Sequence, residues 1–342
     1  MRKSLVIIMV MVLSIVIAVQ VSAEEYTMKF AFQMPDDLYN SNEASFANAF
    51  KTYVEATSNG RIKVKLHPGG VLGKERENFV NVQNNVIQAT LSSVGGVAQF
   101  YDPIAVIDIP FAFRNHLVAY EVLDGWFGQE MRADILDKTG VRCLEVSECG
   151  GFSHFTNNKH EVRTPEDMEG LKFRTMEVPG HIKMINLLGG SATPIAWLEL
   201  YTSLQTGVID GQMNPLPTIL IGKLEEVQKY VTLTNHLYGM DWFMVNNDWY
   251  NSLPADLQKI VNEGARIANI ADRGVQRLLN VEATQKLIDA GLELYTPTPE
   301  ERQMFVDKCQ DGYIEWLSTK VEQEWIDKFL KAIDDAENKL NA

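Results

Sequence analysis

The sequence is poor in the residue types from which disulfide frameworks and zinc sites are built. Its three cysteines are Cys143, Cys149 and Cys309, an odd number that does not give a complete set of pairs. Cys143 and Cys149 fall in one predicted strand, about 20 Å apart, which is too far for a disulfide. We therefore expect three buried free thiols. The six histidines show no metal-site spacing, and the sequence predicts neither a metal nor a cofactor.

Motifs of catalysis and of phosphate binding are also missing. No serine has the G-x-S-x-G setting of a nucleophile elbow. The glycine pairs lack the frameworks G-x-x-x-x-G-K and G-x-G-x-x-G, so we interpret them as turns. The neighbouring carboxylates Glu225 and Glu226 are typical of a solvated helix face. These absences argue against an enzyme.

After residue 23, no apolar run is long enough to cross a bilayer, which takes about 20 residues. The first 23 residues have another pattern. Arg2 and Lys3 precede an apolar run over residues 5–19, and Val21 and Ala23 are small residues at the positions that a signal peptidase reads. A transmembrane helix is the alternative, but the run is short. We predict a signal peptide cleaved after Ala23, a periplasmic protein and no stable membrane insertion.

The chain has an excess of acidic residues. Removing Arg2 and Lys3 with the signal peptide leaves 29 basic against 45 acidic residues, a net charge of −16. This charge argues against nucleic acid and anionic membrane surfaces as partners. An anionic ligand would need a local cluster of hydrogen-bond donors to overcome the overall field. The remaining 319 residues suffice for a large core and two domains.

Strand and helix patterns alternate through the first two-thirds of the chain. Residues 61–66 alternate between charged and apolar side chains, as in a half-exposed strand, whereas residues 41–58 carry apolar side chains at helical spacing. The predicted strands are 28–32, 61–66, 89–93, 171–176 and 208–213, and the predicted helices are 41–58, 74–85, 179–188 and 199–205. A further helix start is predicted at 164–167. The alternation predicts an α/β fold with mainly parallel sheets.

The last third is predicted to be helical. Residues 252–256 carry a strong start signal, and no proline or glycine pair follows before Gly291. One helix of about 35 residues would reach roughly 50 Å, more than the width of a small domain. Such a helix would cross between two domains. Two helices broken near Gly274 are the alternative.

Polar residues at strand ends are the candidates for a binding site, because ligands of such sheets lie beyond the carboxyl ends of the strands. Arg174 follows apolar strand positions, and its guanidinium could hold a carboxylate by two parallel hydrogen bonds. A partly exposed ion pair is the alternative for Arg174. For Asn214 the alternative to a binding role is a turn residue. For Trp197 the alternative is an ordinary core position. Composition and spacing leave these alternatives open.

Four ordered motifs make the chain similar to a known family. They are PGGVLGKER at 68–76, DIPFAF at 108–113, TPEDMEGLKFR at 164–174 and ELYTSLQTGVIDGQMNP at 199–215. In these motifs the chain resembles the DctP-type solute-binding proteins of TRAP transporters, the tripartite ATP-independent periplasmic systems. The similarity covers nearly the whole chain after the predicted signal peptide.

The resemblance implies a periplasmic-binding-protein-like fold. In that fold, two α/β domains joined by hinge strands and a long helix close on a small organic acid. The closed form then docks on TRAP membrane permease subunits that use a sodium gradient. The predicted domain I comprises residues 24–150 plus about 240–279. Domain II comprises 151–239 plus about 280–342, with the ligand cleft between the domains.

The resemblance also assigns site residues, position by position. It places the carboxylate-binding arginine at Arg174, a ligand-contacting asparagine at Asn214 and an aromatic wall at Trp197. Polar contacts at strand ends fall on Gln33 and Ser93.

The stretch GFSHFTN at 151–157 departs from the family, because many relatives have a second arginine where this chain has Ser153. A second carboxylate of a ligand would lack its usual cation, and burying an unpaired charge costs several kcal/mol. The sequence therefore predicts a monocarboxylate ligand. Trp197, Phe152 and Phe155 suggest that its body is apolar or aromatic.

Three further residues are candidates for contact with a hydroxyl or keto group of the ligand: His154, Glu177 and His181. His154 could also restore a partial positive charge, since histidine titrates near neutral pH. For both histidines, a wall position without ligand contact is the alternative. Two other functions are the alternatives. One is a sensory binding protein that feeds a kinase, which would have the same fold and pocket. The other is a periplasmic enzyme that acts on a carboxylate, which would need a nucleophile or a metal.

Overall fold

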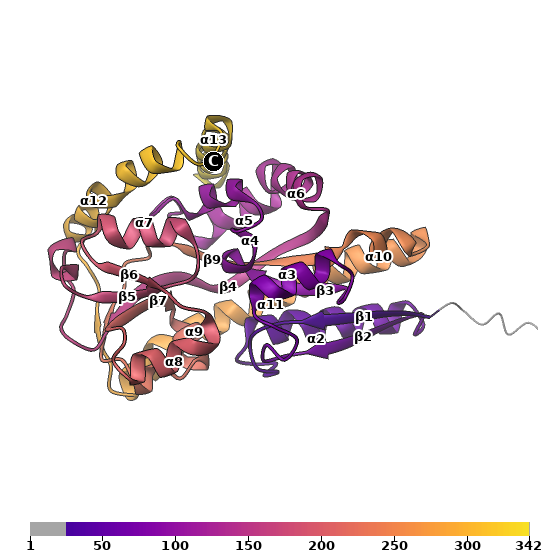
Figure 1. Cartoon of the computed structure of the whole chain (residues 1–342), viewed down its shortest axis with the longest axis horizontal. Coiled ribbons are helices and arrows are strands. Elements are labelled where there is room, and N and C mark those ends of the chain that lie inside the picture. The colour runs from indigo at the N-terminus through magenta and orange to yellow at the C-terminus, as the bar shows by residue number, and fades with distance from the viewer. Residues whose placement is uncertain (1–24, 342) are drawn as a thin grey trace, which may run out of the picture.

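A computed structural model of the chain describes residues 25–341, so the predicted signal peptide and its cleavage site lie outside the described residues. The fold is α/β (Figure 1). The strands are β1 (Tyr26–Ala31), β2 (Ile62–His67), β3 (Ala89–Ser93), β4 (Val141–Asn157), β5 (Lys172–Thr175), β6 (Ser191–Pro194), β7 (Gly211–Pro215), β8 (Tyr230–Thr232), β9 (Tyr238–Asn246) and β10 (Glu293–Tyr295). The α-helices are α2 (Asn42–Thr57), α3 (Glu75–Gln83), α4 (Val94–Val97), α5 (His116–Asp124), α6 (Trp126–Thr139), α7 (Pro179–Leu187), α8 (Trp197–Gln205), α9 (Leu216–Ile221), α10 (Asn247–Ser252), α11 (Ala255–Asp289), α12 (Pro299–Leu317) and α13 (Gln323–Asn341).

The strands are hydrogen-bonded in the order β2-β1-β3-β9-β4-β7-β5-β6, with β8 beside β4 and β10 beside β8. Away from the centre the pairs are parallel, as predicted: β1 with β2 and β3, β5 with β6 and β7, and β8 with β10. At the centre the prediction is wrong, because β4 and β9 run antiparallel to each other and to their other neighbours. The sequence patterns identified no strand at β9. The predicted helix start at 164–167 forms only a short 3₁₀ helix (Pro165–Met168).

The two central strands join the two halves of the molecule. The first part of β4 pairs with β9 beside β3, and its last part pairs with β7 and β8. Between these parts the register shifts, and Gly150 and Gly151 adopt φ angles of 75° and 91°. A side chain is disfavoured at such angles, so the two glycines allow β4 to change direction as it passes from one half to the other.

The long helix α11 is one uninterrupted helix of 35 residues. The prediction of a single long helix is confirmed, and the alternative of a break near Gly274 is wrong. Its first half buries Leu257, Val261 and Ala265 in the core beneath β1 and α2. Its second half buries Ala283 and Leu287 in a separate core with α8 and α9. The helix therefore crosses both domains; in Figure 1 it is the orange helix that passes behind the sheet.

The last two helices pack on different parts of the fold. α12 lies on α7, whereas α13 lies on α5 and α6 at the top of Figure 1. Phe329 of α13 contacts Phe127 of α6 with ring centroids 5.4 Å apart. The predicted domain boundaries remain a prediction, and the packing of α13 favours grouping it with domain I instead of domain II.

Candidate ligand-binding cleft

Three adjoining cavities form a cleft between the two halves, where β1, β3, β5 and β7 end. We call them the outer, the middle and the inner cavity. The outer and middle cavities share Gln33, Glu75, Arg174, Met176 and Trp197. The middle and inner cavities share Ser93, Cys149, Met176 and Asn214. Residues of both halves line each of the three cavities.

Arg174 lies at the centre of the cleft. Its side chain leaves β5 next to the outer and middle cavities, and the residue is only 2% exposed. Its Nε donates a hydrogen bond to the carbonyl oxygen of Ile195 at 2.7 Å, which fixes the plane of the guanidinium. In the described part of the chain, Arg174 has no carboxylate within the 4.0 Å limit of an ion pair. The guanidinium is therefore a buried cation positioned for an external anion.

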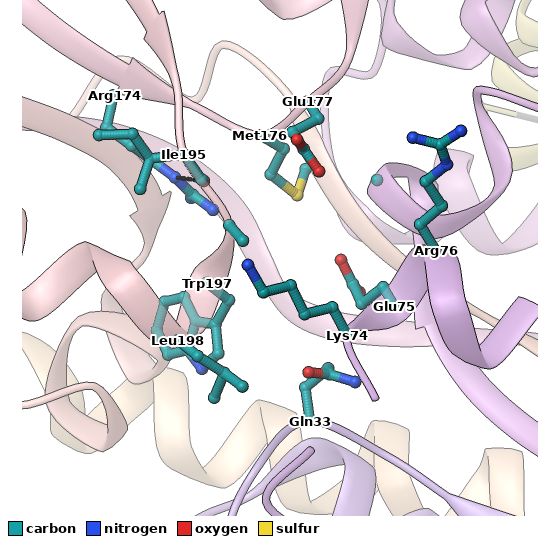
Figure 2. A pocket seen from close by; sticks show the side chains of 12 residues that line it. Gln33, Lys74, Glu75, Arg76, Arg174, Met176, Glu177, Ile195, Trp197 and Leu198 are labelled. Atoms are coloured by element: carbon teal, nitrogen blue, oxygen red, sulfur yellow. Dashed lines mark hydrogen bonds between the residues drawn. The ribbon is translucent and has the colours of Figure 1, made fainter. Parts of the chain in front are cut away.

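Arg174 keeps its positive charge although its side chain is buried. Loss of hydration lowers the pKa of its guanidinium to about 10, and the nearby charges of Glu75 and Glu177 oppose this change. At neutral pH the group remains a cation. Figure 2 shows Arg174 and Trp197 reaching the cavity from one side and Gln33, Lys74 and Glu75 from the other.

Two further cations line the outer cavity, but both are otherwise engaged or directed elsewhere. Lys74 Nζ lies 2.5 Å from Glu199 Oε1, an ion pair that links the start of α3 to α8 across the cleft. Arg76 extends away from Arg174 on the far side of Glu75 (Figure 2). Arg174 is thus the cation best placed to meet an anion inside the cleft.

Carboxyl groups surround the middle cavity. Glu75 accepts a hydrogen bond from the backbone N–H of Ser93 at 2.9 Å, and Glu43 accepts one from that of Met34 at 2.6 Å. Burial raises the pKa of Glu75. Burial and the charge of Asp241 raise the pKa of Glu43, and burial and the charges of Glu75 and Asp272 raise the pKa of Asp241. A second carboxylate of a ligand would meet carboxyl groups here instead of a second cation. A hydroxyl group would find hydrogen-bond acceptors.

The inner cavity contains a buried histidine with a free ring nitrogen. His181 Nε2 lies 3.1 Å from Asp108 Oδ2, and both side chains are almost fully buried. His181 Nδ1 is buried, and no residue of the described chain offers it a hydrogen bond. A buried polar atom without a partner costs about 1–3 kcal/mol. A polar group of a bound ligand could supply the missing partner.

Eight of the predicted site residues line the cleft: Gln33, Ser93, Ser153, Arg174, Glu177, His181, Trp197 and Asn214. His154 does not. Successive side chains of a strand point to opposite faces, so β4 directs Ser153 to the cleft and His154 away from it. His154 Nδ1 accepts the backbone N–H of Asn235 at 3.4 Å, and burial lowers the pKa of His154 to about 3. The expectation that His154 supplies a partial positive charge is contradicted.

Of the three aromatic residues that suggested an apolar or aromatic ligand body, one lines the cleft. Trp197 lines the outer and middle cavities. Phe155 is buried and stacks on His236 with ring centroids 3.9 Å apart, and Phe152 contacts Tyr238 at 5.0 Å; neither lines the three cavities. The other apolar side chains of the cleft include Met34, Met176, Met213, Met240, Leu237 and Tyr238.

The polar residues of the cleft that sequence reasoning missed include Glu43, Glu75, Cys149 and Asp241. Glu75 lies in the motif at 68–76, which could have pointed to it. Asp241 lies in β9, the strand that the patterns did not identify. The cysteines are free, and Cys143 and Cys309 are buried as expected, but Cys149 is only half-buried. Within residues 25–341, no three His, Cys, Asp or Glu side chains are placed to hold a metal ion.

The Trp197 ring packs where Gly222 has no side chain. A Cβ atom built on Gly222 would lie 2.7 Å from Cη2 of the Trp197 ring, which no real contact tolerates. We expect Gly222→Ala to displace the indole and to weaken ligand binding by about 1–3 kcal/mol, the usual effect of overpacking. Calorimetry with a ligand from the screen described below measures this effect. Gly274→Ala is the control, since a Cβ atom there meets nothing within 4 Å; equal affinities of the two variants would contradict the prediction.

The comparisons with known proteins identify the family. The sequence model of the bacterial extracellular solute-binding proteins of family 7, the DctP family, matches residues 39–319. The chain belongs to this family. It is a DctP-type solute-binding protein, as its motifs indicated, and its relatives include proteins of TRAP transporters.

Three relatives illustrate the similarity of this DctP-type protein. A solute-binding protein of Verminephrobacter eiseniae is 39% identical over 227 residues, 66% of this chain and 67% of the relative. A TRAP periplasmic solute-binding protein from Bordetella bronchispeptica, with density assigned to pantoate, has a TM-score of 0.83 and 33% identity, covering 90% of this chain and 99% of that one. The sugar acid binding protein of Advenella mimigardefordensis, in complex with galactonate, has a TM-score of 0.87 and 30% identity, covering 92% and 99%.

Other relatives differ in the ligands that their names give. They include a 2,3-diketo-L-gulonate-binding protein, a C4-dicarboxylate-binding protein and a sialic acid-binding protein. Solute-binding proteins of this family thus bind small organic acids, and they work with membrane permease subunits. From residue 25 to residue 341, no helix of this DctP-type protein has the length and apolar character needed to span a bilayer.

Proposed function

We propose that this DctP-type protein captures a hydroxylated monocarboxylate in the periplasm and delivers it to a TRAP membrane permease. The observation that carries the proposal is the buried guanidinium of Arg174, which faces a cleft between two domains and has no carboxylate partner among residues 25–341. A ligand carboxylate would form two charge-assisted hydrogen bonds with this group. Exclusion of water on closure would strengthen them.

The shortage of further cations supports a single ligand carboxylate. Among the described residues, Arg174 is the one arginine or lysine that lines the middle cavity, and neither residue type lines the inner cavity. Ser153 lines the inner cavity where many relatives have an arginine. Glu43, Glu75 and Asp241 line the middle cavity with carboxyl groups, which offer no positive charge to a second carboxylate.

The remaining polar groups support a ligand that carries hydroxyl groups. Glu75 and Asp241 are acceptors for O–H donors when they are ionised, and Asn214 offers an amide between the middle and inner cavities. His181 Nδ1 has no hydrogen-bond partner among the described residues, so a polar group of the ligand could bond to it. Pantoate and galactonate, the ligands of the two structures compared above, each combine one carboxylate with hydroxyl groups.

We further propose binding without catalysis. Cys149 is the thiol that lines the cleft, and burial, together with the negative charge of Asp241, Glu43 and Glu75, raises the pKa of its thiol well above the usual value. A thiol held in its neutral form is a poor nucleophile. Incubation with a bound acid should therefore yield no new product by mass spectrometry.

Closure of the two domains would retain the ligand. The ion pair between Lys74 and Glu199 links the domains, but both side chains are about half exposed, and such pairs contribute about 0–1 kcal/mol. The ligand itself must therefore supply most of the preference for the closed form, because a ligand shifts a conformational equilibrium only by its difference in affinity for the two states.

A thermal-shift screen of organic acids tests the proposed ligand class. We expect galactonate, erythronate or pantoate to raise the melting temperature more than succinate does. A ligand at 100 times its dissociation constant should stabilise the protein by about 2.7 kcal/mol. Calorimetry then measures the affinity of the best ligand. Stronger stabilisation by succinate than by every monocarboxylate would contradict the proposal.

A further inference from the structure

The outer face of α11 is apolar and exposed. Ile270, Leu278, Val281 and Ile288 have exposed fractions of 57%, 61%, 80% and 47%. The inner face of the same helix is already buried in two cores of the molecule. A helix on the surface of a globular protein normally carries polar residues on its outer face. The outer face of α11 therefore has the character of an interface.

The apolar residues form one continuous stripe. Ile267, Gly274, Val281 and Ile288 follow one another at intervals of seven residues, and Ile270 and Leu278 flank Gly274 at a distance of four residues. We call these six residues the outer stripe. Spacing of this kind places side chains along one side of a helix, as in the seam of a coiled coil.

Gly274 lies at the centre of the outer stripe. A Cβ atom there would meet nothing within 4 Å, so no contact within the molecule requires glycine. Within a helix, glycine costs about 0.5–1 kcal/mol relative to alanine. Glycine at this position does allow a second helix to approach the backbone closely.

The charges beside the outer stripe reverse in sign at its centre. Three ionic residues of α11 are paired with other elements: Asp256 with Arg61, Arg273 with Asp124, and Arg277 with Glu148. Asp272 is fully buried on the inner face of the helix. The remaining ionic residues are Lys259, Glu263 and Arg266 before Gly274, with a sum of +1, and Glu282, Lys286 and Asp289 after it, with a sum of −1. An antiparallel copy of the helix would place each half beside the half of opposite charge. A parallel copy would place like halves together.

We propose that the outer stripe is a homodimer interface, in which α11 packs antiparallel on α11 of a second copy around a two-fold axis near Gly274. A two-fold interface must be complementary to itself. The outer stripe meets this condition, because its apolar residues, its glycine and its charge reversal are all centred on the same position. A different partner protein would not require this symmetry.

The net charge of the chain predicts how the dimer responds to salt. Each copy carries a formal charge of −14 over the full sequence, or −16 without the predicted signal peptide. The repulsion between two such copies is screened as ionic strength rises, whereas apolar contacts are not. We therefore expect the dimer to tighten when sodium chloride is raised from about 10 to 150 mM. A dimer held mainly by ion pairs would weaken.

Sedimentation velocity tests the dimer with protein recovered from the periplasm of an expressing bacterium. We expect Leu278→Glu and Val281→Glu each to raise the dimer dissociation constant at least about tenfold, since a carboxylate would be buried twice in the interface. Val208→Glu is the matched control, because Val208 is 58% exposed but lies outside α11. Ligand affinity should be unchanged in all three variants. A wild-type protein that stays monomeric at about 100 μM, or a Val208→Glu variant that is as impaired as the others, would overturn the proposal.

Disulfide trapping tests the direction of the pairing. Gly274→Cys should oxidise to a covalent dimer, because this position meets itself at the axis. Gln285→Cys alone should not form a covalent dimer. A mixture of Glu263→Cys and Gln285→Cys should form a disulfide between the two variants, because antiparallel helices bring these positions together. The wild-type chain is the control for its own cysteines. Self-linking of Gln285→Cys as readily as Gly274→Cys would indicate parallel helices and refute the proposed arrangement.

Discussion

Arg174→Ala is expected to remove most of the ligand affinity of the protein. Truncating one partner of a buried charge pair costs about 2–5 kcal/mol, a loss of roughly 30- to 4,000-fold in affinity. The fold should survive, because Arg174 is a buried cation that forms no ion pair among the described residues. Removing it also removes the cost of keeping a charge away from water. Isothermal calorimetry with the best ligand of the screen gives the affinity, and thermal melting checks the fold.

Two further variants separate the charge of Arg174 from its shape. Arg174→Lys keeps a cation but loses the planar fork that holds a carboxylate by two bonds, so its affinity should lie between those of the wild type and Arg174→Ala. Arg76→Ala removes a cation that lines the outer cavity but extends away from Arg174, and its effect should be small. If Arg174→Ala bound the ligand as tightly as Arg76→Ala does, the assignment of Arg174 would be wrong.

Asp272→Asn is expected to change the pH dependence of stability. Asp272 is fully buried between α2, β4 and α11, where it accepts hydrogen bonds from Ser45, Ser147 and Gln276. Burial raises the pKa of its carboxyl group from 3.8 to about 7. Its contribution to stability is therefore full below its unfolded pKa of 3.8 and is lost as the pH rises through about 7.

The expected effect of Asp272→Asn follows from the size of this shift. A shift of about three pKa units corresponds to roughly 4 kcal/mol. The free energy of unfolding of the variant, minus that of the wild type, should therefore rise by about 4 kcal/mol between pH 4 and pH 8. Urea denaturation at several pH values measures it. Asp137→Asn is the control, since the Asp137 side chain is 77% exposed; identical pH profiles for the two variants would contradict the prediction.

Local sequence patterns predicted the helices and strands whose own residues carry start, stop or periodicity signals. The single helix α11 could be predicted because no proline or glycine pair interrupts the chain between its start signal and Gly291. Arg174 could be singled out as a candidate because it follows apolar strand positions and lies in a family motif. Comparison with the family pattern also showed that Ser153 takes the place of a cation. These conclusions depend on neighbours in the sequence, which the chain itself specifies.

The tertiary structure decided which side chains meet. Which of Ser153 and His154 faces the cleft depends on the face that β4 presents after its register shift, and only pairing with β7 and β9 sets that face. Glu43 and Asp241 lie nearly 200 residues apart in the sequence, yet they line one cavity with Arg174. The sequence alone determined the family and the long helix, and it led to Arg174 as the cation proposed for the site. The acidic surroundings of that cation needed the folded chain, because burial and charge repulsion act between groups that only long-range strand pairing brings together.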